Sequence, residues 1–291
     1  MQQVVSSAFD HSDWAVLASG ADYPDALSAL ALAGAHHAPV VLTAPDTLSP
    51  QAAEELRRLG CTNLVCVGGP AAVSDAVLDQ ARGIVGSVTR VSGDSRYETS
   101  LAAFREARAA SSASDTVILA TGGNFADALS AGPWSWRTVA PVVLVKPDGT
   151  LTAEAVEQIR SDAGIKRVVI MGGEAAVSES VRTQLGDGYE YVRLAGADRY
   201  QTSATAAQWF SGHGLNWARP YVATGTGFAD ALAAAAVAGA GSAPLVLVNP
   251  NSQDAPSAIS AHREDIREVT IVGGTSAVGA SAEGALRSAL R

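Results

Sequence analysis

The segment Leu119-Ala-Thr-Gly-Gly-Asn-Phe-Ala-Asp127-Ala-Leu-Ser130 has two relatives elsewhere in the 291-residue chain. They are Leu17-Ala-Ser-Gly-Ala-Asp-Tyr-Pro-Asp25-Ala-Leu-Ser28 and Val222-Ala-Thr-Gly-Thr-Gly-Phe-Ala-Asp230-Ala-Leu-Ala233. The aspartates of the three segments are spaced by 102 and 103 residues. A fixed period of this length predicts one structural unit written three times.

Further motifs follow the first segment in the same order. Ala140-Pro-Val-Val-Leu144 recurs at 38–42 and 243–247, and Gly172-Gly-Glu-Ala-Ala-Val-Ser178 recurs at 68–74 and 273–279. Arg193-Leu-Ala-Gly-Ala-Asp-Arg-Tyr-Gln-Thr-Ser203 has one counterpart, at 90–100. The register predicts repeats at 1–92, 93–195 and 196–291, with the first cut short at its N-terminal side and the third lacking a final strand.

Within one repeat, short apolar runs alternate with helical patterns. From the second repeat into the start of the third, we expect strands at 116–120, 141–145, 167–171 and 191–194 and helices at 125–136, 152–160, 175–185 and 199–209. Continuous apolar strands between helices are typical of a parallel sheet covered on both faces. The fold class predicted is therefore α/β, with flavodoxin-like or Rossmann-like modules.

Three such modules are expected to pack in a pseudo-threefold arrangement rather than as separate beads. A unit of about 100 residues buries only part of its unfolded surface and is marginal alone. Linkers are almost absent, since 91–93 and 195–196 are the only joints that the sequence offers. We therefore expect a monomer with an internal pseudo-trimer.

Composition excludes several classes of protein. The net charge of −9 argues against nucleic-acid binding, which favours a basic surface. The sequence contains no run of 18 strongly apolar residues, so a membrane span is not predicted. Cys61 and Cys66 lie about 16 Å apart if they share one strand, so we expect buried thiols rather than a disulfide. The first 13 residues have no signal-peptide pattern, which fits either a cytoplasmic protein or a mature fragment.

Taken together, the motifs resemble those of the cell wall-binding repeat type 2 family, which occurs as tandem triplets in secreted bacterial surface proteins. The matching pieces are 121–133, 140–145, 172–178 and 193–203 with their counterparts, and they cover nearly the whole chain. The resemblance implies non-covalent anchoring to the bacterial cell wall through a teichoic-acid-like or other anionic glycopolymer. It also implies a secreted protein, its signal peptide removed or outside this sequence, with no cofactor. Two departures are the truncated first repeat and Gly279 in place of the motif serine.

The Gly-Gly motifs and four arginines are the candidate polymer contacts. Each Gly-Gly motif follows a strand and is expected to open a helix, a geometry that presents backbone N–H groups to an anion. Guanidinium groups suit phosphate or uronate. The predicted set is Gly68, Gly69, Ser74, Arg90, Arg96, Gly172, Gly173, Ser178, Arg193, Arg199, Gly273 and Gly274.

Each candidate also has a structural interpretation. The glycines would permit tight turns, and Arg199 would pair with an acid such as Asp127 at a contact between repeats. The repeated aspartates are expected in helix first turns, capping or pairing with arginine. Trp134 and Trp136 would stack on sugars or pack at an interface.

The repeated motifs supply glycine, aspartate and arginine but no nucleophile–base pair. None of the five histidines recurs at equivalent positions, so no metal site is predicted, and no Gly-x-Ser-x-Gly elbow occurs. We therefore predict a binding module without catalysis. The alternatives are an enzyme (a cell-wall hydrolase or nucleotide-using protein) with its site at the Gly-Gly strand ends, or a structural surface-layer or scaffold protein.

Overall fold

A computed structural model describes residues 2–291, which form three parallel sheets. The first sheet has the order β2-β1-β3-β4, the second β6-β5-β7-β8 and the third β10-β9-β11. The strands are β1 (Trp14–Ser19), β2 (Val40–Thr43), β3 (Asn63–Val67), β4 (Ser87–Val91), β5 (Thr116–Thr121), β6 (Val142–Val145), β7 (Arg167–Met171), β8 (Glu190–Leu194), β9 (Tyr221–Thr224), β10 (Leu245–Val248) and β11 (Thr270–Val272). The predicted α/β class is confirmed, and an order of 2-1-3-4 within a sheet is that of flavodoxin-like folds.

Helices separate the strands along the chain. They are α1 (Gln2–Val5), α2 (Pro24–Ala35), α3 (Pro50–Leu59), α4 (Asp75–Arg82), α5 (Arg96–Ala110), α6 (Ala126–Leu129), α7 (Gly132–Thr138), α8 (Ala153–Ser161), α9 (Ser180–Leu185), α10 (Arg199–Ser211), α11 (Ala229–Ala240), α12 (Asp254–Ala261) and α13 (Ala280–Ala289). We call a sheet with the helices between its strands a module, and number the modules in chain order.

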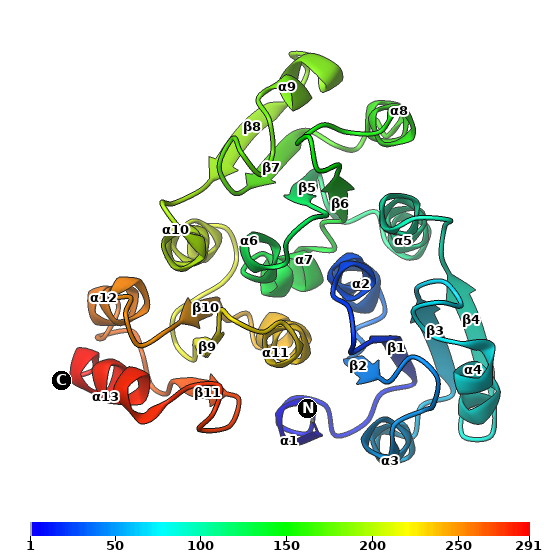
Figure 1. Ribbon diagram of the computed structural model, residues 1–291, viewed down its shortest axis with the longest axis horizontal. Coiled ribbons are helices and arrows are strands. Elements are labelled where there is room, and N and C mark those ends of the chain that lie inside the picture. The colour runs from blue at the N-terminus through cyan, green and yellow to red at the C-terminus, as the bar shows by residue number, and fades with distance from the viewer. Residues whose placement is uncertain (1) are drawn as a thin grey trace.

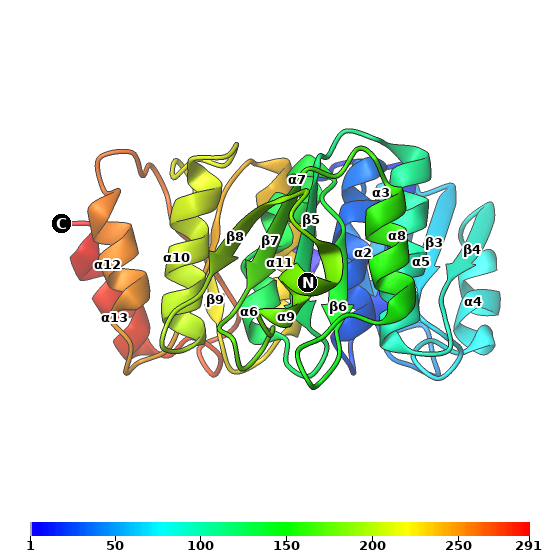
Figure 2. The same ribbon diagram turned by 90° about the horizontal axis from the view of Figure 1, so that it is seen from above.

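The three modules surround a common axis, which Figure 1 views end-on. Helices α2, α7 and α11 lie together at the centre, and the sheets lie outside them. Seen from the side in Figure 2, the long helices run along the short dimension of the molecule. The pseudo-threefold arrangement is therefore present, and its centre is a bundle of one helix from each module.

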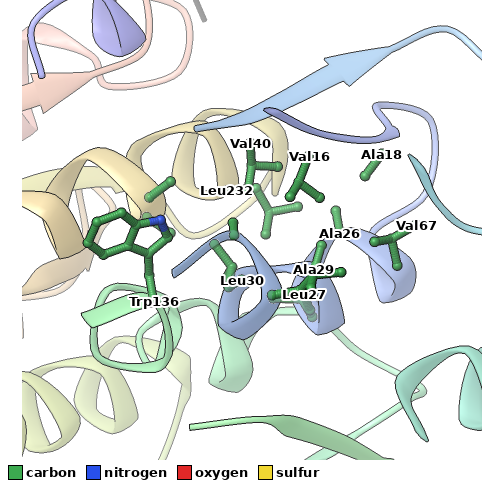
Figure 3. Close-up of a cluster of buried hydrophobic side chains, with 14 of the residues drawn as sticks. Val16, Ala18, Ala26, Leu27, Ala29, Leu30, Val40, Val67, Trp136 and Leu232 are labelled. Atoms are coloured by element: carbon green, nitrogen blue, oxygen red, sulfur yellow. The ribbon is translucent and has the colours of Figure 1, made fainter. Parts of the chain in front are cut away.

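The central helices approach closely because glycines on two of them face a large residue on the third. Gly34 in α2 and Gly239 in α11 occupy the positions equivalent to Trp136 in α7. A Cβ on Gly34 would collide with the Trp136 backbone, and one on Gly239 would lie 2.7 Å from the Pro133 carbonyl oxygen. Figure 3 shows Trp136 projecting from α7 toward Leu30 and Leu232 of the neighbouring helices. One tryptophan thus fills the space that two glycines leave.

The sequence predicted one helix over 125–136, and the structure has two, α6 and α7, with the break at Ser130 and Ala131. Pro133 explains the difference, because proline has no N–H and fits only in the first turn of a helix. The equivalent positions in α2 and α11 are Ala31 and Ala236, and those helices continue without interruption.

The ends of the central helices are also equivalent. His37, Val139 and Ser242 occupy matching positions, and each has a positive φ, of 51°, 58° and 53°. A left-handed residue turns the chain out of a helix. Each turn leads directly into the Ala-Pro motif and the second strand of its module.

Two other expectations concern the cysteines and the membrane. Cys61 and Cys66 are both buried and free, as predicted. Burial raises the pKa of the Cys66 thiol to about 12, which makes it a poor nucleophile. Over residues 2–291, no helix combines the length and apolar character needed to cross a bilayer.

Candidate functional site

Aromatic side chains join the three modules at one end of the axis. Tyr23, Phe125 and Phe228 each lie two residues before a repeated aspartate. Their ring centroids are 5.4 Å apart for Tyr23–Phe125, 6.0 Å for Tyr23–Phe228 and 5.8 Å for Phe125–Phe228. Because each residue follows the carboxyl end of a first strand, the carboxyl edges of all three sheets meet at this end. This is the edge at which open α/β folds bind ligands.

Arg96 and Arg199 each cross from one module to the next. Arg96 Nη1 donates to the Gly122 carbonyl oxygen at 2.6 Å, and Arg199 Nη1 donates to that of Gly225 at 2.7 Å. Arg96 also forms an ion pair with Asp22 at 3.3 Å and lies over the Tyr23 ring. The Arg96 side chain keeps 35% of its surface exposed, so part of the guanidinium is open to a ligand.

The residue after each of these arginines is a tyrosine that covers a glycine. A Cβ on Gly122 would lie 2.8 Å from the Tyr97 ring, and one on Gly225 would lie 2.5 Å from the Tyr200 ring. Arg199 itself lies over the Phe125 ring, 5.5 Å from its centroid. The expected Arg199–Asp127 ion pair is replaced by the hydrogen bond to a carbonyl oxygen, although the contact does lie between modules.

The repeated aspartates lie in the first turns of α2, α6 and α11, as predicted. Each packs against the first glycine of a Gly-Gly motif. A Cβ on Gly68 or Gly172 would lie 2.7 Å from Oδ2 of Asp25 or 2.5 Å from that of Asp127, respectively. Gly273 stands in the same relation to Asp230, at 2.8 Å. The first glycines also have φ of 126°, 96° and 119°, so both backbone and space require glycine there.

Burial raises the pKa of Asp25 to about 6, and the nearby Asp22 carboxylate adds to the rise while Arg96 opposes it. Burial also raises the pKa of Asp127, but a hydrogen bond from Thr202 and the charge of Arg199 work against the increase. The acids therefore occupy distinct electrostatic settings at equivalent positions.

Arg90 and Arg193 hold the Gly-Gly turns from the last strands of their sheets. Arg90 Nη1 donates to the Gly68 carbonyl oxygen at 2.6 Å, and Arg193 Nη1 donates to that of Gly172 at 2.9 Å. Arg90 also pairs with Asp75 at 2.9 Å, and Arg193 with Glu179 at 2.6 Å. Their side chains are only 18% and 16% exposed. Arg193 and Arg199 therefore donate to carbonyl oxygens of different modules, those of Gly172 and Gly225.

The expectation that a Gly-Gly motif opens a helix is wrong. A turn follows each glycine pair, and α4 and α9 begin only at Asp75 and Ser180. The glycines are therefore not at a helix N-terminus. Ser74 N and Ser178 N donate to the carbonyl oxygens of Pro45 and Gly149, which fastens the turn to the loop after the second strand. Gly279, at the third position, caps α13 with its backbone alone.

A pocket of about 310 Å³ lies at the carboxyl edge of the first module. Its polar lining combines three acids, a guanidinium and small residues from the repeated motifs: Ser19, Asp22, Asp25, Gly69, Gly93, Asp94, Ser95, Arg96 and Thr99. Such a lining suits a ligand that carries both hydroxyl groups and charge. The lining brings Gly69 and Arg96 together from the predicted set, whereas Gly68 lies behind Gly69, against Asp25.

Trp134 and Trp136 are buried, at 3% and 4% exposure. Their indole N–H groups donate to the carbonyl oxygens of His213 and Ala38, each at 2.9 Å. Of the two interpretations, interface packing is therefore correct. Sequence reasoning missed the aromatic cluster, although a signal was present: an aromatic residue stands at the same place before each repeated aspartate.

The fold and this edge define a triplet of parallel α/β modules with an internal threefold axis. The chain belongs to the Cell wall binding domain 2 (CWB2) family, whose model matches residues 2–78, 90–182 and 193–283. The resemblance found in the sequence is thereby confirmed.

Relatives of known function are longer than this chain. N-acetylmuramoyl-L-alanine amidase LytC of Bacillus subtilis is 28% identical over 95% of the chain and 53% of its own length. The amidase enhancer of the same organism is 25% identical over 97% of the chain and 37% of its own length. The chain thus spans about half or less of these two proteins.

Two solved structures share the fold. Cwp8 from Clostridium difficile superposes with a TM-score of 0.85 at 24% identity, over 99% of this chain and 49% of that one. Cwp6 from the same organism gives 0.84 at 21% identity, over 98% and 46%. These similarities support the three-module architecture and not a particular ligand.

Proposed function

We propose that the chain is a non-catalytic cell wall-binding module that anchors a secreted protein to the bacterial envelope. The observation that carries the proposal is the threefold match to a cell wall-binding family over most of the chain. We further propose repeat boundaries at 1–92, 93–195 and 196–291, and a monomer in solution.

The ligand we propose is an anionic wall glycopolymer held at the shared carboxyl edge. The pocket beside Arg96 supports this assignment, because it offers a partly exposed guanidinium together with hydroxyl and backbone groups. Of the predicted residues, Arg96, Arg199 and the second glycines of the Gly-Gly motifs are the direct contacts. Arg90, Arg193, Ser74 and Ser178 act by fixing the turns that carry those glycines.

The net charge of −9 opposes binding of a polyanion over the whole surface. Binding at this edge therefore depends on local cations, and Arg96 is placed to supply one. The acidic charge on the rest of the protein surface would limit contact to the pocket and keep other faces away from the polymer. This arrangement predicts a modest dependence on salt, because few ion pairs form.

An enzymatic function finds less support. The lining of the first-module pocket contains acids and hydroxyl groups but no imidazole or thiol. Relatives with amidase activity in their names match along only part of their length. We propose that catalysis, where present in such proteins, belongs to other segments.

The test is co-sedimentation with purified bacterial sacculi before and after chemical removal of anionic polymers, across a series of salt concentrations. We expect binding to intact sacculi and little binding to stripped ones. Binding that survives stripping would reassign the ligand to peptidoglycan. Turnover of a wall fragment without sedimentation would favour the enzyme.

Two variants locate the site. Arg96→Gln should weaken sedimentation at least about tenfold, since it removes a charge-assisted contact. Arg57→Gln removes the same charge from an exposed position at the end of α3 and should bind normally. Thermal unfolding of both variants separates lost affinity from lost stability. Equal binding by the two proteins would remove Arg96 from the site.

A further inference from the structure

The amino edge of the third module has a pocket that the proposed polymer site does not use. The pocket has a volume of about 470 Å³ and lies where α10 and α12 end and before β9 begins. Figure 1 shows the two helices side by side along the third sheet. Because helix ends and a strand start meet here, the pocket lies at the edge opposite to the carboxyl ends of the strands. Its lining includes Gln208, Ser211, Leu215, Asn216, Trp217 and His262.

The second module has an ion pair at the equivalent place. Arg108 of α5 donates to both carboxylate oxygens of Asp162, each at 2.7 Å, and to the Ser114 carbonyl oxygen at 2.6 Å. Asp162 follows the end of α8, and the pair borders a cavity of about 610 Å³. In this module the guanidinium and the carboxylate therefore satisfy each other with a two-pronged contact.

The third module has other residues at both positions of this ion pair. By the repeat period, Ser211 of α10 is equivalent to Arg108. Helices α8 and α12 each have a buried alanine followed four residues later by a buried isoleucine. Aligning the two helices on these residues makes His262 equivalent to Asp162. A hydroxyl and an imidazole thus line this pocket where a guanidinium and a carboxylate line the other.

Trp217 and His262 form an aromatic wall of the pocket. Their ring centroids are 4.4 Å apart and their planes differ by 7°. Trp217 is only 4% exposed, and its buried indole nitrogen has no hydrogen-bond partner within residues 2–291. Its counterpart in the second module, Ser114, donates its hydroxyl to a backbone carbonyl oxygen. A buried donor without an acceptor costs free energy, so an acceptor on a ligand beside Trp217 would be favourable.

Amide and hydroxyl groups complete the lining. His262 Nε2 and Gln208 Oε1 are 2.6 Å apart, a contact that uses only one end of the Gln208 amide. Asn216 Nδ2 donates to the Ser242 carbonyl oxygen at 3.1 Å, which fixes the Asn216 side chain. Leu215 adds an apolar surface. An aromatic and apolar wall with a few placed hydrogen-bonding groups is typical of sites for small organic ligands.

The charges of the pocket argue against an ionic ligand. Its lining contains neither lysine nor arginine, and its one acid, Asp265, has a side chain that is 71% exposed. An anion would meet this carboxylate without a guanidinium to offset it. Within the described part of the chain, no three histidine, cysteine or acidic side chains are grouped so that they could hold a metal ion. An uncharged ligand that both donates and accepts hydrogen bonds therefore fits best.

We propose that this pocket binds one unit of an uncharged N-acetylated amino sugar. The acetamido carbonyl oxygen accepts from the Trp217 indole N–H, and the acetamido methyl group packs against Leu215. Sugar hydroxyl groups bond to the remaining end of the Gln208 amide and donate to Ser211, whose own hydroxyl donates to the Ala207 carbonyl oxygen. The site is separate from the Arg96 pocket and does not depend on polymer binding there.

The test follows the indole N–H resonances of protein with isotope-labelled tryptophan while N-acetylglucosamine is added, with Trp217→Phe used to assign the Trp217 signal. We expect that signal to move saturably, with a Kd of about 1–10 mM, and more than the other indole signals. Glucose should bind at least about tenfold more weakly, because it has no acetamido acceptor for the indole. No movement of the Trp217 signal up to about 50 mM N-acetylglucosamine, or equal affinity for glucose, would overturn the proposal.

A matched double variant gives the second test. Ser211→Arg with His262→Asp rebuilds the ion pair of the second module and should weaken N-acetylglucosamine binding at least about tenfold without lowering the unfolding temperature. If this variant does not fold, Gln208→Ala replaces it and should weaken binding about threefold or more. Undiminished binding by the folded variant would overturn the proposal. Because the titration uses free sugar and reads Trp217, its result is independent of sedimentation through Arg96.

Discussion

The contact between modules at α10 and the contact between α11 and β2 use equivalent glycines for different purposes. Gly225 is buried beneath Tyr200, and its carbonyl oxygen accepts a hydrogen bond from Arg199. Gly20 has the same place in its module but lines an open pocket. One sequence position therefore requires glycine where a helix covers it and tolerates a side chain where none does. The requirement arises from the neighbouring module and not from the local turn.

The largest expected effect comes from opening the contact at α10, where Tyr200 covers Gly225. Tyr200→Ala would remove a buried ring and leave a cavity beside Gly225, costing about 3–5 kcal/mol of unfolding free energy. Denaturant unfolding measures the loss. Tyr200→Phe keeps the ring and should change stability by less than about 1 kcal/mol. A small loss in the alanine variant would mean that the tyrosine does not close the contact.

The stability of the protein is expected to depend on pH through Asp25, the repeated aspartate of the first module. Asp25 has a pKa of about 6 in the folded protein, above the ordinary value of 3.8. Its protonation therefore favours the folded state, and this contribution is full below about pH 4 and is lost as the pH rises through 6. Asp25→Asn does not titrate, so its stability relative to the natural protein should increase by up to about 3 kcal/mol between pH 4 and pH 7.

Denaturant unfolding at several pH values between 4 and 7 gives the comparison for Asp25. The two proteins should differ most in slope between pH 4 and pH 6. Parallel stability profiles would show that Asp25 has an ordinary pKa in the folded state.

A matched set of alanine substitutions compares all three contacts directly. Gly122→Ala and Gly225→Ala press against tyrosine rings and should each cost about 1–3 kcal/mol. Gly20→Ala has room and should be neutral or stabilising by up to about 1 kcal/mol. Thermal unfolding of the three variants measures the difference. Equal losses at all three positions would show that Gly20 is covered as closely as Gly122 and Gly225 are.

The smallest effect concerns the aromatic cluster. Phe125 and Phe228 each contact two aromatic rings. Phe125 differs because it also lies under the Arg199 guanidinium. Phe125→Leu should therefore cost about 0.5–1 kcal/mol more than Phe228→Leu, since it also removes a cation–π contact. The reverse order in denaturant unfolding would show that Arg199 gains nothing from the ring.

The sequence predicted the strands of the second module well because their apolar runs are short and bounded by glycine or proline. It failed at the helix over 125–136, where Pro133 divides α6 from α7 while alanine continues the other two central helices. It also failed at the Gly-Gly turns, because glycine after a strand signals a reversal without fixing where the next helix begins. In both cases the proline or glycine signal was present in the sequence, but the helix boundary was placed at the wrong residue.

The candidate site was predicted in part. The repeated motifs identified Arg96 and Arg199, but they grouped them with Arg90 and Arg193, which hold turns in their own sheets. Residue type alone does not tell an arginine that donates to a carbonyl oxygen of the next module from one that donates to a carbonyl oxygen of its own sheet. The aromatic cluster was missed because its three rings are about 100 residues apart in sequence.

The repeat period and the apolar alternation, which are local properties of the chain, determined that this protein is three copies of one parallel α/β module. Only the tertiary structure decided that Trp136 occupies the space left by Gly34 and Gly239, and that Gly122 and Gly225 are covered where Gly20 is not. Packing and burial at these positions depend on residues from other modules. A pattern within one module cannot specify them, because the same glycine is compatible with either surrounding.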